Sequence, residues 1–120
     1  MNRKALVREY KDAKLPMGLF QVKNTVNGKI FIGTSMNLPG MLNRIRFQLE
    51  MGGHPNRTLQ QDWNTHGSAA FVFEVLDELK HPETDKYDSS NDLEELLRLW
   101  MEKLQPYGER GYHIASKAKA

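Results

Sequence analysis

The stretch from residue 18 to residue 34, GLFQVKNTVNGKIFIGT, constrains the fold more than any other part of the chain. Two short apolar runs flank Asn27-Gly28, and both residues of that pair tolerate the positive φ angles of a tight turn. The pattern predicts a β-hairpin with strands at about 19–23 and 29–34. A phenylalanine stands in the middle of each predicted strand, Phe20 in the first and Phe31 in the second.

Two helices are predicted after the hairpin. Asn37 is placed to cap the first, with Pro39 in its first turn and Gly52-Gly53 at its end, and Asn56 is placed to cap the second, which Gly67 closes. Their predicted apolar faces are Met41, Leu42, Ile45, Phe47 and Leu49 in the first helix, and Leu59 and Trp63 in the second.

The second half of the chain predicts one more strand and one more helix. The run AFVFEVLDEL, residues 70–79, is apolar enough at its start to predict a central strand. A polar, acidic loop follows at 80–92, and a helix capped by Ser90 or Asn91 then extends to Pro106. Its predicted apolar stripe is Leu93, Leu96, Leu97, Trp100 and Leu104. The predicted fold class is α+β, with a small three-stranded antiparallel sheet flanked by helices.

The length of 120 residues predicts one domain. We expect it to occupy residues 17–115, preceded by a helical extension at 1–16 and followed by a basic tail at 116–120. Apolar runs are too short for a membrane span, the charged N-terminus lacks the core of a secretory signal, and a cytoplasmic location is expected. The absence of cysteine excludes thiolate zinc sites and a cysteine nucleophile.

Charge is distributed unevenly along the chain. The net charge is +2, but residues 74–95 carry nine acids and two lysines, so their balance is −7 and that of the remaining chain is +9. This division permits a basic face that could meet nucleic acid, with the acidic segment directed elsewhere. A solvated charged surface without a partner is the alternative.

The triplets Gly18-Leu19-Phe20 and Phe31-Ile32-Gly33 resemble the two motifs, Gly-Ile-Tyr and Tyr-Ile-Gly, that name the GIY-YIG nuclease superfamily. The surrounding segments resemble the phage homing endonucleases of that superfamily: QVKNTVNGK in the hairpin, GGHPNRTLQQDWNTHG with its histidine, Leu-Gln, aromatic-Asn and His-Gly, and GYHIA near the end. The resemblance extends over about residues 17–115 and implies a GIY-YIG-like domain.

The resemblance also implies a reaction and the positions that carry it. Family members hydrolyse a phosphodiester with one divalent metal ion, two tyrosines, an arginine and a glutamate on the last helix. The metal and the arginine stabilise charge on the phosphate, and a tyrosine relays a proton. In this chain these positions, together with that of a family asparagine, fall on Phe20, Phe31, Met41, Leu97 and His113.

Four of these five positions are apolar. Phenylalanine keeps the tyrosine ring but lacks its hydroxyl, and neither Met41 nor Leu97 can replace a charged side chain. We therefore expect a catalytically inactive domain without a metal ion or other cofactor, in which the substituted side chains pack together and close the ancestral cavity.

An active endonuclease using shifted residues is the first alternative. Arg44 lies three residues after Met41, Glu94 lies three residues before Leu97, and His54 matches a position where family members often carry histidine. Such an enzyme would use Mg²⁺ or Mn²⁺. Glu94, however, is also placed to complement the dipole at the start of its helix.

DNA or another nucleic acid is the expected partner, and no membrane partner is expected. Candidate phosphate contacts are Arg44, Arg46, His54 and Arg57, because they lie on or beside the two helices after the hairpin. A module that binds an unspecified protein and no nucleic acid is the second alternative, suggested by the acidic loop. His66 is expected to cap or pack at a helix end, and His81 to be exposed.

Overall fold

The computed structural model describes residues 15–82 and 87–114 of the chain. Its strands are β1 (Met17–Asn24), β2 (Ile30–Ser35) and β3 (Phe71–Leu79), and its longer helices are α2 (Leu38–Glu50), α3 (Arg57–His66) and α4 (Ser90–Leu104). The strands form one antiparallel sheet, so the predicted α+β class is confirmed. The helix predicted within 1–16 and the tail at 116–120 fall on residues that lie largely outside the described part.

Strand β1, rather than β3, is the centre of the sheet. The strand order is β2-β1-β3, so the prediction that the third strand is central was wrong. Residues 17–22 of β1 are all buried, whereas Val72 and Val75 on β3 are each 41% exposed. The apolar run in β3 therefore reflects one covered face and an exposed edge, since β1 alone pairs with two neighbours.

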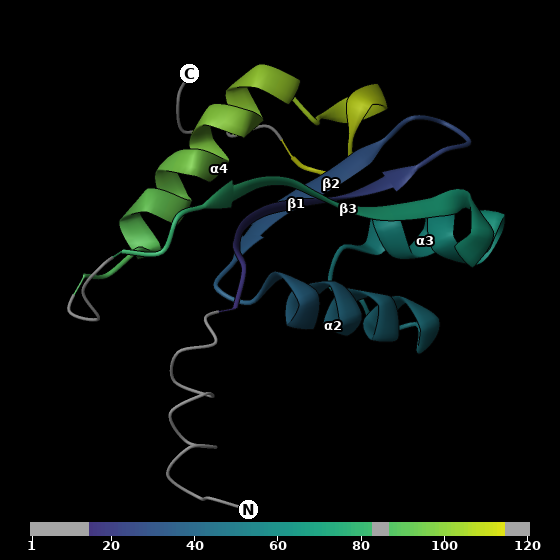
Figure 1. Cartoon of the computed structure of the whole chain (residues 1–120). Helices are drawn as coiled ribbons and strands as arrows, with labels where there is room; N and C mark the ends of the chain where they lie inside the picture. Colours follow the sequence, from purple (N-terminus) through teal and green to yellow (C-terminus); the bar gives the residue numbers. More distant parts are fainter. Residues whose placement is uncertain (1–14, 83–86, 115–120) are drawn as a thin grey trace, which may run out of the picture.

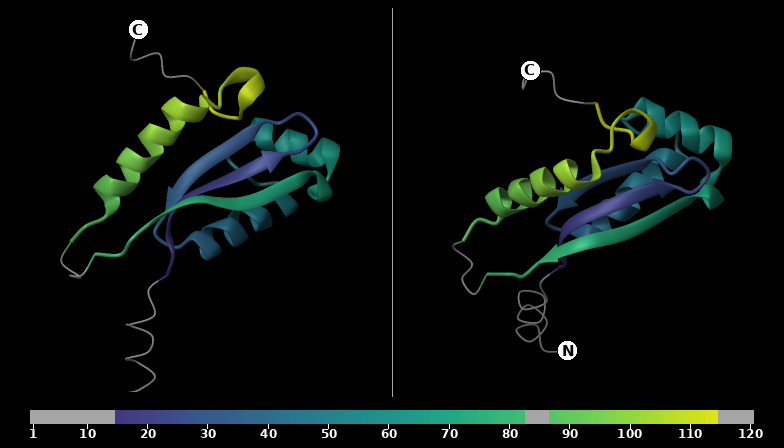
Figure 2. Two further views of the ribbon diagram at one scale, coloured as in Figure 1. Left: turned by 45° about the horizontal axis from the view of Figure 1, so that its top comes forward. Right: turned by 90° about the horizontal axis from the view of Figure 1, so that it is seen from above.

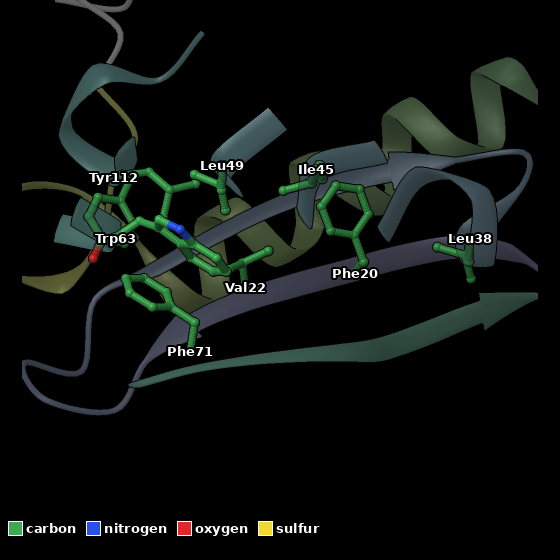
Figure 3. Close-up of a cluster of buried hydrophobic side chains, with 9 residues drawn as sticks. Phe20, Val22, Leu38, Ile45, Leu49, Trp63, Phe71 and Tyr112 are labelled. Carbon is green, nitrogen blue, oxygen red and sulfur yellow. The ribbon is translucent and has the colours of Figure 1, made fainter. Parts of the chain in front are cut away.

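Helices cover both faces of the sheet, as Figures 1 and 2 show: α2 and α3 lie against one face and α4 lies against the other. Phe20 and Val22, two residues apart on β1, share the face of α2 and α3. The main buried cluster on that face is Phe20, Val22, Leu38, Ile45, Leu49, Leu59, Trp63, Phe71 and Tyr112. Figure 3 labels all of these residues except Leu59 and shows their side chains above the sheet.

The hairpin forms where predicted, but its turn is longer than the Asn-Gly pair. Asn24 N donates to Lys29 O and Gly28 N donates to Asn24 O, so four residues separate the paired positions. Only Gly28 adopts a positive φ, of 79°, and Asn27 instead accepts a hydrogen bond from Lys29 N through its side chain. The predicted hairpin is therefore confirmed, but the tight Asn-Gly turn that the pair indicated does not form.

The motif glycine at the start of β1 is required by the backbone. Gly18 has a φ of 155°, and a Cβ there would lie 2.1 Å from the carbonyl oxygen of Asp77 on β3. A register irregularity between Leu19 and Phe20 follows directly after it. Any other residue at this position would force the two strands apart.

Both helices after the hairpin begin at the predicted caps. The Asn37 side chain accepts from Gly40 N at the start of α2, and the Asn56 side chain accepts from Leu59 N at the start of α3. One residue of the predicted apolar face of α2 was wrongly assigned, because Phe47 is 63% exposed. It lies two positions from both Ile45 and Leu49, on the opposite side of the helix.

Helix α4 begins at Ser90, one or two residues earlier than the predicted caps imply, and neither Ser90 nor Asn91 caps it. Ser89 is the N-cap by position but makes no capping bond, while Asp88 accepts a hydrogen bond from Ser90 N. Leu93 is the one buried residue of α4, and the rest of its predicted apolar stripe is half-buried. Trp100 Nε1 donates to Asp77 on β3 over 3.1 Å, which fixes the helix on the sheet.

The segment after α4 returns to the free edge of β2. Tyr112 N donates to Ile30 O over 3.0 Å, and Ile32 N donates to Nε2 of His113 over 2.9 Å. These bonds confirm the short extended segment predicted near the end of the chain. None of the described helices is long and apolar enough to span a bilayer.

Candidate nucleic-acid interface

Phe20, Phe31 and Met41 lie together on the α2 side of the sheet. They line a cavity of about 510 Å³ rather than filling it. Phe20 is a core residue, 3% exposed, whereas Phe31 and Met41 are half-buried and form part of the wall. The other lining residues are Arg44, Ile45, Gln48, His54, Pro55 and Asn56.

Phe31 is held by aromatic contacts on several sides. Its ring stacks on His113 with a centroid separation of 5.0 Å and an interplanar angle of 4°. His54 meets the ring edge-on at 5.4 Å, and Phe20 lies tilted at 6.3 Å. The two substituted positions Phe31 and His113 thus contact each other directly, and the histidine supports the ring that replaces a tyrosine.

His54 is 8% exposed and is fixed in one tautomer. Its Nδ1 accepts from Asn56 N over 3.0 Å, so the neutral ring carries its proton on Nε2, which has no partner among the described residues. Its backbone N–H donates to Gln60, which also donates to Leu49 O. Burial lowers the pKa of His54, partly offset by the bond from Asn56, so the ring presents a neutral Nε2–H donor.

His113 is also held neutral. Burial lowers its pKa, and its Nε2 accepts the hydrogen bond from Ile32 N. Protonation at Nε2 would remove an acceptor from a backbone N–H of β2. His113 is therefore a support for β2 and Phe31, and the sequence offered no local signal for this role.

A network around Tyr112 was also missed by sequence reasoning. The Tyr112 hydroxyl donates to Asp62 over 2.7 Å and accepts from Asn24 over 3.1 Å, and Asn27 donates to Asp62 as well. Burial and then Asp62 raise the pKa of Tyr112, while the bonds from Tyr112 and Asn27 lower the pKa of Asp62 against the effect of its own burial. The network ties the hairpin turn and α3 to the segment after α4.

The candidate arginines separate into two groups. Arg44 is exposed and lines the cavity, and Arg57 is exposed and lines an adjoining hollow of about 430 Å³ that shares His54 and Pro55 with it. The guanidinium of Arg46 instead lies 4.3 Å over the ring of Phe73 on β3. The structure thus brings Arg44, His54 and Arg57 together and directs Arg46 elsewhere.

Leu97 and Glu94 do not line either hollow. Both belong to α4, on the opposite face of the sheet, where Leu97 is half-buried and Glu94 is exposed. No aspartate or glutamate lines the cavity or the adjoining hollow. Within residues 15–82 and 87–114, no group of three or more His, Cys, Asp or Glu residues is placed to hold a metal ion.

Comparisons by sequence and by structure both identify proteins that are similar to this chain. The chain is 33% identical over 64 residues to intron-associated endonuclease 1 of Enterobacteria phage T4, which is 53% of this chain but only 26% of the phage protein. The fold of this chain is similar to that of the catalytic domain of the homing endonuclease I-TevI, with a TM-score of 0.68 and 28% sequence identity. The match covers 83% of this chain and 99% of that domain.

A point-mutant form of the same I-TevI domain gives the same TM-score and identity, with 84% of this chain and 95% of that domain covered. No protein-family model matches the chain. The architecture around the cavity thus resembles that of an endonuclease catalytic domain, while the side chains that line the cavity are apolar, amide or basic.

Proposed function

We propose that this GIY-YIG endonuclease-like domain binds DNA and does not cleave it. The observation that carries the proposal is the lining of the cavity: Phe20, Phe31 and Met41 stand on its wall, Arg44 and His54 supply its donors, and no carboxylate is present. Such a surface can bind DNA but lacks groups for activating water.

The residues present do not fit the divalent metal ion that the fold family implies. Mg²⁺ and Mn²⁺ are held by carboxylate oxygens, carbonyl oxygens and water. The described residues that line the two hollows include two arginines and no acid, so a cation there would meet net positive charge. No step of the proposed function therefore involves a metal.

Phosphate binding follows from two side chains. Arg44 and Arg57 are exposed and make no ion pair with any described residue, and the neutral ring of His54 lies between them, lining both hollows. Charged donors such as these arginines position a DNA backbone without reading its sequence. Arg46 is excluded from this set because it lies over Phe73.

The salt dependence of binding tests the phosphate contacts. In the double variant Arg44→Ala and Arg57→Ala, the slope of log K against log salt should fall by about 2, roughly 0.9 for each phosphate that an arginine no longer neutralises. The matched control removes two cations from α4, Arg98→Ala and Lys103→Ala, and should leave the slope unchanged. An unchanged slope in the first variant would contradict the assignment.

Plasmid nicking tests the absence of hydrolysis. Supercoiled plasmid incubated with the protein and Mg²⁺ or Mn²⁺ should stay intact at every metal concentration. Nicking that requires the metal and disappears in Glu94→Ala would instead favour an endonuclease with shifted residues. Intact plasmid together with no DNA binding at low salt would favour a module for protein partners.

A further inference from the structure

The wall of the cavity suits an apolar, planar group better than a phosphate. Five of its nine lining residues are hydrocarbon or thioether side chains: Phe20, Phe31, Met41, Ile45 and Pro55. A phosphate among them would lose its hydration without gaining enough hydrogen bonds. The volume of about 510 Å³ lies in the range of roughly 300–1,000 Å³ that small-ligand sites occupy.

Two unpartnered polar groups remain available in this apolar wall. The half-buried side-chain amide of Gln48 makes no hydrogen bond to any described residue, and Nε2–H of His54 is likewise without a partner. Asn56 differs, because its amide donates to Tyr112 O and accepts from Leu59 N. The cavity therefore offers an acceptor and donors of the kind found on nucleobase edges.

The aromatic surface is already fixed before a ligand arrives. Phe31 is held by the stacked ring of His113 and the perpendicular ring of His54, and the tautomers of both histidines are set by backbone hydrogen bonds. A ring immobilised in this way loses little side-chain entropy when a base stacks on it. Stacking on aromatic side chains is the usual means by which proteins hold unpaired bases.

We propose that the cavity receives a single unpaired nucleobase, stacked against Phe31 and Met41, while Arg44 on the rim binds the adjoining phosphate. The base edge meets Gln48 and His54. This inference rests on the proposed DNA binding and specifies its preferred form: duplex DNA with an extrahelical or terminal unpaired base. The cavity thus gains a ligand that fits its apolar wall as well as its charged rim.

Two duplexes of the same sequence test the inference, one fully paired and one with a single extrahelical adenine. The protein should bind the second duplex about tenfold more tightly. That is the gain in affinity expected when one base stacks on an aromatic side chain. With ¹³C-methyl methionine, the Met41 methyl resonance should shift under the ring current of the bound base. Met51, directly after the same helix and 70% exposed, provides the internal reference and should not shift.

Filling the cavity is the complementary test. Met41→Trp should abolish the preference for the unpaired base while paired DNA still binds, and Met51→Trp, which adds the same side chain outside the cavity, should keep the preference. Equal affinities for both duplexes with an unshifted Met41 resonance would overturn the inference but leave DNA binding intact. Failure to bind either duplex at low salt would overturn both proposals.

Discussion

The ring of Phe20 lies directly against Gly33, its partner across the β1–β2 ladder. A Cβ at Gly33 would lie 2.8 Å from Cζ of Phe20 and 3.0 Å from its Cε2. The second motif glycine therefore makes room for an aromatic ring at the first motif's third position, whether or not that ring carries a hydroxyl. This packing accounts for Gly33, whereas Gly18 is required by the close approach of the Asp77 carbonyl oxygen.

Gly33→Ala should lower the free energy of unfolding by about 1–3 kcal/mol, because the added methyl overpacks a buried ring. Urea denaturation measures the change. Gly53→Ala is the matched control, since a Cβ there would meet nothing within 4 Å and its φ is not positive. Combining Gly33→Ala with Phe20→Leu should recover part of the loss, and strict additivity would contradict the contact.

The two buried histidines predict a pH dependence of stability. Burial lowers the pKa of both His54 and His113 below the ordinary value of 6.5, so the unfolded chain binds more protons once the pH falls below about 6.5. Their contribution is complete above that pH and is lost as the pH falls through the folded-state pKa values.

Denaturation at about pH 7.5 and about pH 5.5 checks this direction, since the lower value lies below the unfolded histidine pKa. The parent protein should be less stable at the lower pH, and His113→Asn should show a smaller difference. His66→Gln, at an exposed position, should behave like the parent. A difference in His113→Asn as large as in the parent would show that His113 contributes nothing.

At the scale of elements, the segment after α4 is joined to the hairpin and to α3. Tyr112 contacts Asn24 at the end of β1 and Asp62 on α3, and its backbone carbonyl accepts from Asn56, the cap of α3. One tyrosine thus joins its own segment to two elements, β1 and α3, that lie far from it in the sequence. The candidate interface depends on it, because Asn56 also positions His54.

Tyr112→Phe should lower the free energy of unfolding by about 1–3 kcal/mol, because buried Asn24 and the Asp62 carboxylate each lose a partner. Chemical denaturation measures the loss. Tyr87→Phe removes a hydroxyl that also bonds to an aspartate, Asp92, but at an exposed position, and should change stability little. Equal effects of the two substitutions would contradict the role assigned to burial.

Elements with local signals were predictable, and their arrangement was less so. The caps Asn37 and Asn56 and the hairpin were read from neighbouring residues, and the structure contains each of them. The position of β3 in the sheet could not be predicted in this way, because an apolar run has the same composition at an edge as at the centre of a sheet. Strand order depends on pairings over long sequence separations, which composition does not record.

The same division applies to the candidate site. The resemblance to a nuclease family placed Phe20, Phe31 and Met41 at one location, and the structure brings them together around the cavity. The contacts of Phe31 with His113 and of Tyr112 with Asp62 join distant parts of the chain and had no local sequence signal. The cation–π contact between Arg46 and Phe73, which separates Arg46 from the candidate interface, likewise had no local sequence signal.

At the scale of the whole molecule, the candidate DNA contacts lie on one side of the sheet. Arg44, Arg57 and His54 lie on the side of α2 and α3, whereas the described acids of residues 74–95 belong to β3, to residues 87–89 and to the start of α4. Figure 2 shows α4 on the face of the sheet opposite to α2. DNA should therefore approach the domain from one side.

Hydrogen exchange with and without DNA tests this orientation. Amides in the segment 38–57 should gain protection when DNA is bound, because it contains the rim of the cavity and the adjoining hollow. Amides in 90–104, on the far face, serve as the internal control and should exchange at unchanged rates. Protection concentrated in 90–104 would contradict the proposed interface.

The support of Phe31 by His113 has a consequence for protein synthesis. The bond from Ile32 N to His113 spans 81 residues, so the hairpin leaves the ribosome long before the residue that steadies it. A nascent chain can pair β1 with β2, but Phe31 lacks the stacked ring of His113 until residue 113 has left the ribosome. With the proposed DNA binding, the aromatic surface of the cavity is therefore complete only after that residue has been synthesised.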